Sequence, residues 1–276
     1  AIGFVNAVIL MPKFMTPDQI GLFRTLLSAA LLLSNFGRFG VNSGLVRFKS
    51  LLKHPQTELK SLYGLGILIV FLSTLFFLII LIIFRSSWSD FYAEKSPQIN
   101  DYFILLIVLT LELIVFQFLQ TLASVHKNIF AANLLKDLVY KCLNMGGILL
   151  FATSVISFHT FIILHVYFYI ILITLLFFES LYKYKIKISF KPLTPKITRE
   201  LIYYCGTLFI SGLGLSFLNL ADQQLVSRYL GLETSGIYMT AIFMVMVIEM
   251  PRRFVGEISA PIISEAFGSG NLTIIN

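Results

Sequence analysis

The chain has 276 residues, of which 57% are hydrophobic and only 13% are charged, and its formal net charge is +7. Soluble domains carry about 25% charged residues, so this composition excludes an ordinary soluble domain and indicates an integral membrane protein. The basic balance does not indicate nucleic-acid binding, because Lys and Arg stand in short gaps between apolar runs instead of gathering on one solvated face. We expect no nucleic-acid partner.

Eight apolar segments have the length and composition of membrane-spanning helices, which need about 20 apolar residues to cross the hydrocarbon core. The first is a shortened span, and none shows the ten-residue alternation of a β-barrel strand. The sequence therefore predicts an all-α, polytopic transmembrane helix bundle. The predicted spans are 1–12, 20–46, 62–84, 102–124, 138–157, 159–182, 201–227 and 234–251.

The second predicted span carries a stripe of polar residues spaced 4, 7, 3 and 4 positions apart, which places them on one face of one helix. A charged side chain inside a span costs about 2.5–3.5 kcal/mol and usually faces a cavity or a partner. The spacing thus predicts a cavity wall, with ordinary helix packing and Arg side chains reaching the two interfaces as the alternative. The stripe consists of Arg24, Ser28, Asn35, Arg38 and Asn42.

The fourth and fifth predicted spans carry weaker signals. Glu112 stands in the fourth span, followed by Gln117, Gln120 and Ser124 on one face, and we treat Glu112 and Gln117 as secondary site candidates. Asp137 and Lys141 are four residues apart, which predicts an ion pair within one helix.

The seventh and eighth predicted spans add a second polar stripe and a charged pair. Asp222 is the acid of the stripe, and pairing with Arg228 or Arg24 near the membrane interface is the alternative to a cavity role. Glu249 and Arg253 repeat the four-residue spacing of an ion pair. The site candidates from these two spans are Asn219, Asp222 and Arg253, with Gln223 and Glu249 as secondary ones.

Other chemistry is not indicated. The four histidines have no metal-ligand spacing, and His165 reads as a lone core residue, so we expect no metal site. Cys142 and Cys205 lie in apolar segments and read as unpaired packing residues. Phosphate-binding loops and nucleophile elbows are absent from the sequence, so we expect no enzyme and no cofactor.

The distribution of Lys and Arg predicts the orientation. Of the 21 such residues, only five fall on one side of the predicted membrane, and the other sixteen follow the second, fourth, sixth and eighth spans or lie at the inner end of the second. By the positive-inside rule, the N-terminus is cytoplasmic. The five are Lys13, Arg24, Arg85, Lys95 and Arg228.

Two short stretches repeat one pattern 215 positions apart. FMTPDQIGLF at 14–23 and YLGLETSGIY at 229–238 match Gly21 to Gly236, and the offset also brings Arg38 onto Arg253. An even number of intervening spans makes this a parallel repeat. It predicts a six-helix lobe over 1–182 and a basic cytoplasmic linker over 183–200. Residues 201–276 are then the first two helices of a truncated second lobe, in a fragment of a chain with about twelve spans.

These segments also carry a resemblance to a known family. The stretches PKFMTPDQIGLFRTLLSAALLLSNFGRFG at 12–40 and ADQQLVSRYLGLETSGIYMTAIFMVMVIEMPRRFVGEISAPIISEAFGSGN at 221–271 resemble polysaccharide exporters of the multidrug/oligosaccharidyl-lipid/polysaccharide flippase superfamily, which includes O-antigen flippases of lipopolysaccharide synthesis. The resemblance implies two MATE-like six-helix lobes around a central cavity that opens alternately to either side of the bacterial inner membrane. It also implies that Arg24, Asp222 and Arg253 lie inside that cavity.

The implied substrate is a lipid-linked oligosaccharide, an undecaprenyl diphosphate-linked glycan. Arg24 and Arg38 would attract its anionic headgroup, and Asn and Ser side chains would bond its hydroxyls. We expect contacts with membrane lipids and with polysaccharide assembly proteins, and leave open a coupling cation, Na⁺ or H⁺. A cation-coupled multidrug antiporter using Asp222 and Glu112 is the alternative, and a membrane-embedded glycan polymerase or transferase is the second.

Overall fold

The chain folds into a bundle of long helices. The computed structural model describes residues 2–49, 51–52, 55–126, 130–184 and 187–249, and these ranges contain helices and turns but no strand. The prediction of an all-α polytopic membrane bundle is confirmed. Within the described residues, six helices are long and apolar enough to cross a membrane: Pro17–Arg38, Glu58–Ile83, Pro97–Val125, Phe158–Lys183, Pro195–Leu218 and Leu232–Glu249.

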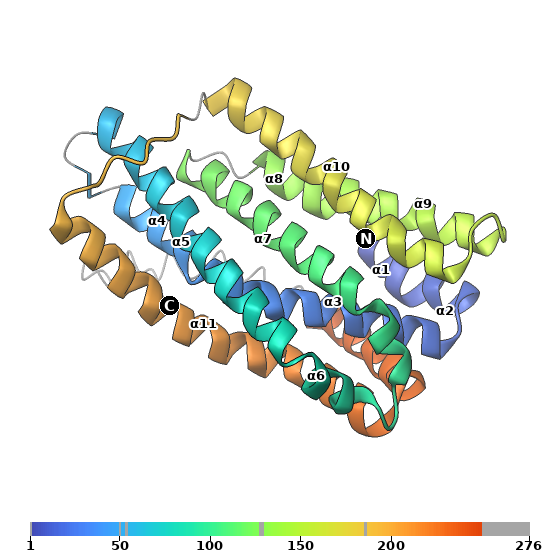
Figure 1. The fold of residues 1–276 in the computed structure, drawn as a ribbon. Coiled ribbons are helices and arrows are strands. Elements are labelled where there is room, and N and C mark those ends of the chain that lie inside the picture. The colour runs from blue at the N-terminus through green and yellow to red at the C-terminus, as the bar shows by residue number, and fades with distance from the viewer. Residues whose placement is uncertain (1, 50, 53–54, 127–129, 185–186, 250–276) are drawn as a thin grey trace, which may run out of the picture.

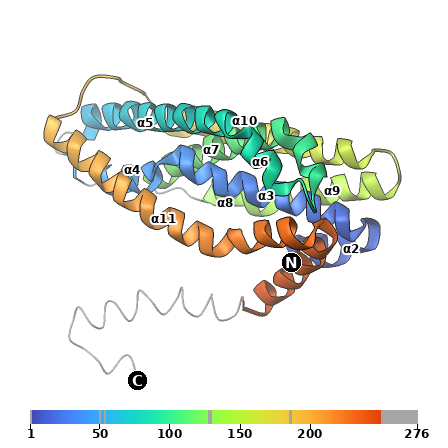
Figure 2. The same ribbon diagram turned by 60° about the horizontal axis from the view of Figure 1, so that its bottom comes forward.

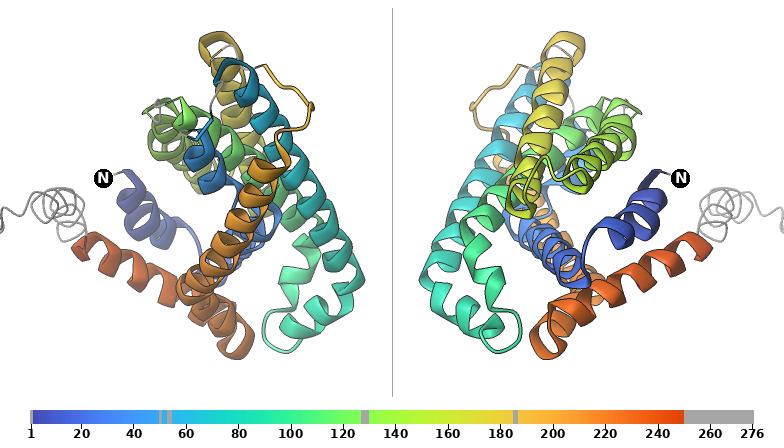
Figure 3. Two further views of the ribbon diagram at one scale, coloured as in Figure 1. Left: turned by 90° about the vertical axis from the view of Figure 1, so that its left-hand side faces the viewer. Right: turned by 90° about the vertical axis from the view of Figure 1, so that its right-hand side faces the viewer.

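Most of the long helices run along one direction (Figure 1), whereas the Leu232–Glu249 helix projects to the side of the bundle on which the N-terminus lies (Figure 3). We call the end that carries α4 and the start of α11 the basic end, and the end that carries α6 the far end. The elements are α1 Ile2–Phe4, η1 Val5–Leu10, α2 Met11–Phe14, α3 Pro17–Arg38, α4 Val41–Lys49, α5 Pro55–Ile83, α6 Arg85–Tyr92, η2 Pro97–Tyr102, α7 Phe103–Val125, α8 Phe130–Leu134, η3 Leu135–Val139, α9 Tyr140–Ala152, α10 Phe158–Tyr184, α11 Pro195–Leu230 and the helix Leu232–Glu249.

The prediction of one continuous helix over 20–46 is wrong, because the chain breaks between α3 and α4. Phe39 and Gly40 have φ angles of 46° and 68°, a left-handed conformation that interrupts the helix. A side chain on Gly40 would also overlap the carbonyl oxygen of Cys205 in α11, so only glycine fits this corner. Asn42 therefore lies in the first turn of a second helix instead of continuing the face that carries Arg38.

Other predicted bounds shift by a few residues. The fifth predicted span, 138–157, is displaced: its helical run starts at Phe130, contains the π-helical segment η3 and ends at Ala152. Ser154, with φ of 58°, turns the chain toward α10. Next to the predicted 183–200 linker, α10 continues to Tyr184 and α11 starts at Pro195.

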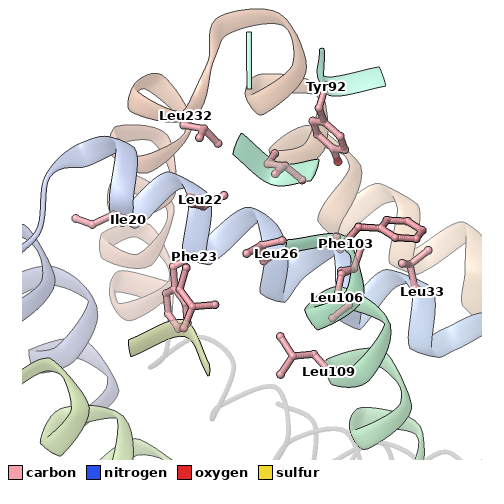
Figure 4. Close-up of a cluster of buried hydrophobic side chains, with 14 of the residues drawn as sticks. Ile20, Leu22, Phe23, Leu26, Leu33, Tyr92, Phe103, Leu106, Leu109 and Leu232 are labelled. Atoms are coloured by element: carbon pink, nitrogen blue, oxygen red, sulfur yellow. The ribbon is translucent and has the colours of Figure 1, made fainter. Parts of the chain in front are cut away.

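Two apolar clusters hold the bundle together. The first joins α3, α7 and the Leu232–Glu249 helix at the far end, where Phe23 and Leu26 are 1% exposed and Leu106 is fully buried (Figure 4). The second lies at the basic end and joins α4 and α5 to α7, α10 and α11. α3 and α7 supply most of the first cluster and therefore form its centre, where close side-chain packing associates the helices in lipid.

The two repeated stretches lie against each other at the far end. A side chain on Gly21 would overlap the carbonyl oxygen of Leu232, and one on Gly236 would overlap that of Pro17. Gly21 and Gly236 are matched by the 215-residue offset, and so are Pro17 and Leu232. The contact is therefore reciprocal, as at a two-fold axis, and only glycine permits so close an approach of the two helices.

One histidine at the basic end makes stability depend on pH. The His126 ring accepts or donates a hydrogen bond with the Tyr63 hydroxyl at 2.8 Å. Burial, and then the charge of Lys49, lowers the pKa of His126 below its ordinary value of 6.5. Below pH 6.5 the histidine of the unfolded chain binds a proton more readily than the folded one does. The stabilising contribution of neutral His126 is therefore complete above pH 6.5 and is lost as the pH falls below that value.

We expect the melting temperature in detergent to fall on acidification. His126→Gln should remove part of that pH dependence, whereas His159→Gln, exposed in the first turn of α10, should leave it unchanged.

Candidate functional site

A buried network of hydroxyl and amide groups closes the far end between α3, α11 and the Leu232–Glu249 helix. Thr25 Oγ1 and Ser227 Oγ are 2.6 Å apart, and Ser227 Oγ donates to Ser235 Oγ at 2.8 Å. Ser28 Oγ accepts from Gln224 Nε2 at 2.5 Å. We call this network the hydroxyl seam, and its members are Thr25, Ser28, Tyr92, Ser96, Gln224, Ser227 and Ser235.

The hydroxyl seam yields a stability prediction. Tyr92 is 1% exposed and donates its hydroxyl hydrogen to Gln224 Oε1 at 2.5 Å. Burial raises the pKa of this hydroxyl, against the opposing effect of Arg228, so it stays protonated and remains a donor. Tyr92→Phe leaves the Gln224 oxygen buried without a partner and should cost about 1–3 kcal/mol, measured as thermal unfolding in detergent. Tyr102→Phe, whose hydroxyl meets the exposed His159, should change stability by less than about 0.5 kcal/mol.

Toward the basic end, α3 and α11 separate around a polar pocket. α11 runs alongside α3 and α4 over their length (Figure 2), and the pocket between them has a volume of about 310 Å³. Three members of the predicted stripe line it: Asn35, Arg38 and Asn42. The break at Phe39 and Gly40 turns Asn42 back to this pocket although it stands on another helix.

A second pocket of about 420 Å³ continues the first toward the basic end, and the two share Asn42 and Ser43. It adds the Arg47 guanidinium, which lies 4.4 Å from the centre of the Tyr204 ring. We call the two pockets together the polar groove. Its lining residues are Asn35, Arg38, Gly40, Asn42, Ser43, Val46, Arg47, Thr121, Ser124, Tyr204, Leu208, Phe209, Ser211, Gly212, Leu213 and Leu215.

The polar groove is positively charged. Arg38 and Arg47 line it, and no Asp or Glu is among its lining residues in the described part of the chain. Arg38 donates Nε–H to Ser34 O at 3.4 Å and takes part in none of the ion pairs seen between described residues. Its remaining N–H groups are thus available to an anion, which a guanidinium binds with two parallel hydrogen bonds.

Amide and hydroxyl groups stand beside the Arg38 charge. Asn35 Nδ2 donates to Ser216 Oγ at 2.8 Å, which ties α3 to α11 across the groove. Asn42 Oδ1 is buried and has no hydrogen-bond partner in the structure. A buried polar atom without a partner is costly, so this oxygen is an acceptor for a hydroxyl-bearing ligand or for water.

Arg24 and Ser28, the other members of the stripe, lie outside the polar groove. Ser28 is 5% exposed and belongs to the hydroxyl seam. Arg24 lies where α2, α3 and the Leu232–Glu249 helix meet, with its guanidinium 4.2 Å from the centre of the Phe243 ring and 3.5 Å from Met11 Sδ. The predicted stripe is thus split between a closed end and an open groove.

Comparison with known proteins identifies the family. A family model described as polysaccharide biosynthesis protein matches residues 1–267. The chain belongs to this family of polysaccharide biosynthesis membrane proteins. Searches of curated proteins and of solved structures found no match.

For this polysaccharide biosynthesis family member, none of the remaining candidates that the structure describes is among the lining residues of the polar groove. Asp222 is exposed and accepts from the Tyr238 hydroxyl at 2.5 Å, so it joins two helices and does not pair with Arg228 or Arg24. Gln117 is half-buried on α7. Arg253, which is also the predicted ion-pair partner of Glu249, and the side chain of Asn219 lie outside the described residues.

Two candidates are buried polar side chains away from the groove. Glu112 is 8% exposed and Gln223 is 1% exposed, and each carries side-chain atoms without a hydrogen-bond partner. The ion pair predicted between Asp137 and Lys141 is confirmed at 3.0 Å, on the surface.

Sequence reasoning missed part of the groove lining. Arg47 was predicted only as an inner-side charge, and Ser43, Tyr204 and Ser211 were not singled out. The signal for Arg47 was the glycine at position 40, which marks the helix break that directs α4 into the groove.

Proposed function

We propose that this chain moves a lipid-linked oligosaccharide, an undecaprenyl diphosphate-linked glycan, across the bacterial inner membrane during surface polysaccharide synthesis. The observation that carries the proposal is the polar groove, in which Arg38 lies beside Asn35 and Asn42 and has no carboxylate partner among the described residues. A diphosphate bound there would accept hydrogen bonds from the guanidinium, and sugar hydroxyls would bond to the amides. The family, whose description is polysaccharide biosynthesis, supports the same substrate class.

The asymmetry of the two ends supports transport by alternating access. The hydroxyl seam and the Gly21–Gly236 contact close the far end, while the polar groove opens toward the basic end. By the positive-inside rule we place the basic end in the cytoplasm, where the lipid-linked substrate is made. Export would require the seam to separate and the groove to close. The protein then acts as a transporter, not as an enzyme.

A genetic test addresses the function directly. Deletion of the gene in its host should abolish surface polysaccharide and cause lipid-linked oligosaccharide to accumulate on the cytoplasmic face of the membrane. The accumulated lipid is measured by extraction and mass spectrometry.

Normal polysaccharide with increased sensitivity to cationic drugs would instead favour a multidrug antiporter, for which the buried carboxyl of Glu112 is the supporting observation. Complete lipid-linked precursors that fail to polymerise, with translocation intact, would favour a glycan polymerase.

A further inference from the structure

A band of buried polar groups crosses the interior of α7, α9 and α10, outside the polar groove. His165 is 0% exposed, and Asn144 and Glu112 are each 8% exposed. Each of them leaves one acceptor atom without a hydrogen-bond partner: His165 Nε2, Asn144 Oδ1 and Glu112 Oε2. Acceptors left unpaired among apolar side chains are costly, so the band calls for a ligand that donates hydrogen.

The tautomer of His165 follows from its one hydrogen bond. Nδ1 lies 2.9 Å from the carbonyl oxygen of Phe161. A carbonyl only accepts, so Nδ1 carries the hydrogen and the lone pair stands on Nε2. The rings of Phe23 and Phe161, with centres 4.4 and 4.8 Å from the imidazole, enclose it. His165 thus presents a basic nitrogen between aromatic rings, without a hydrogen-bond partner among the described residues.

Two tyrosines connect His165 to Glu112. The ring centre of Tyr140 is 6.1 Å from that of His165 and 5.0 Å from that of Tyr169. The Tyr140 hydroxyl faces Asn144 and Tyr169 but meets neither at hydrogen-bonding geometry, and Tyr169 lies within electrostatic range of Glu112. The band therefore runs from α10 through α9 to α7.

The charges around the band are few. From α3, Arg24 acts electrostatically on both His165 and Tyr140, and from α7 the facing acid is Glu112. η3 and α9 carry Lys136, Asp137 and Lys141, of which Asp137 and Lys141 form an ion pair on the surface. The positive charge of Arg24 thus disfavours a proton on His165.

We propose that His165, with Glu112 as a second acceptor, forms a proton-binding site in the interior of the bundle. A proton from water adds to the Nε2 lone pair to give an imidazolium, and no other bond forms or breaks. Among the described residues no three His, Cys, Asp or Glu side chains come together as metal ligands, whereas a proton needs one lone pair. Since Arg24 opposes this charge, an anion bound at Arg24 and a proton on His165 favour each other. Only the identity of that anion rests on the proposed function.

A chain with a single histidine tests the site without measuring transport. Substitution of His54, His126 and His159 by Gln leaves His165 as the only imidazole, whose ring nitrogens are followed by ¹⁵N nuclear magnetic resonance in nanodiscs across a pH series. We expect Nε2 to change from the neutral to the protonated signal on acidification while the chain stays folded. Arg24→Gln should shift that change to higher pH. If the threefold variant does not fold, difference spectra between the unaltered chain and His165→Gln isolate the same signal.

The second acceptor is read by infrared spectroscopy. Glu112→Gln should remove a carboxyl band that responds to pH, whereas Glu94→Gln, at an exposed turn, should not. A His165 signal that stays neutral at every pH at which the chain is folded, with or without Arg24, would show a structural histidine only and overturn the proposal. A signal that responds to replacement of Na⁺ by choline but not to pH would assign the band to a cation instead, and so contradict it.

Discussion

Gly21→Ala and Gly236→Ala are each expected to lower the free energy of unfolding by about 1–3 kcal/mol, although alanine is the better helix former. The added methyl group would overlap the carbonyl oxygen of Leu232 in the first case and of Pro17 in the second. Backbone atoms cannot rotate away as a flexible side chain can, so the two helices must separate. Thermal unfolding in detergent measures the effect, and we expect export to fall with it.

Gly146→Ala and Gly214→Ala are the matched controls, because nothing lies within 4 Å of a methyl group at either position. They should leave stability unchanged or raise it by up to about 1 kcal/mol, the helix-propensity difference. Equal effects of all four substitutions would contradict a specific close contact between the repeated stretches.

Arg38→Ala is expected to reduce export of lipid-linked oligosaccharide about ten- to a hundredfold. A hydrogen bond to a charged group contributes about 1.5–3 kcal/mol, and each 1.4 kcal/mol corresponds to a factor of ten in binding. Arg38→Lys keeps the charge but loses the planar pair of donors, so it should restore export only in part. Surface polysaccharide and accumulated lipid-linked precursor are the two readouts.

Arg199→Ala is the control for that substitution, because Arg199 is exposed near the start of α11 and lines neither pocket of the polar groove. It removes the same charge from the same end of the bundle and should leave export unchanged. If Arg38→Ala and Arg199→Ala behave alike, the headgroup does not bind at Arg38.

The start of α3 could be predicted from the sequence, but its end could not. Thr16 and Gln19 form a capping box with Pro17 at the first helical position, which is a local signal. The break at Gly40 depends on the close approach of Cys205, more than 160 positions away, while the polar spacing runs on without interruption to Asn42. Gly40 is thus a local sign of a helix end, but the polar spacing outweighed it in the prediction, and the contact that requires glycine there comes from a distant helix.

The candidate site was likewise predictable in part. The spacing of Asn35, Arg38 and Asn42 indicated a shared face, and the structure does bring them to one pocket. The spacing did not show that the Ser28 hydroxyl would accept a hydrogen bond from Gln224. Nor did it show that His165, which reads as a lone core residue, has polar neighbours on α3 and α9. These partners come from other helices, and single-helix periodicity carries no information on them.

The central claim is that Arg38 and its neighbours face a water-filled groove between α3 and α11, and cysteine accessibility tests it most directly. In a chain with Cys142 and Cys205 replaced by Ala, single cysteines at Asn35 and Asn42 should react with a membrane-impermeant, water-soluble maleimide applied from the basic end. Cysteines at Leu72 and Phe76, which are 54% and 67% exposed on the apolar surface of α5, should not react. Protection of positions 35 and 42 together with labelling of 72 and 76 would contradict the groove.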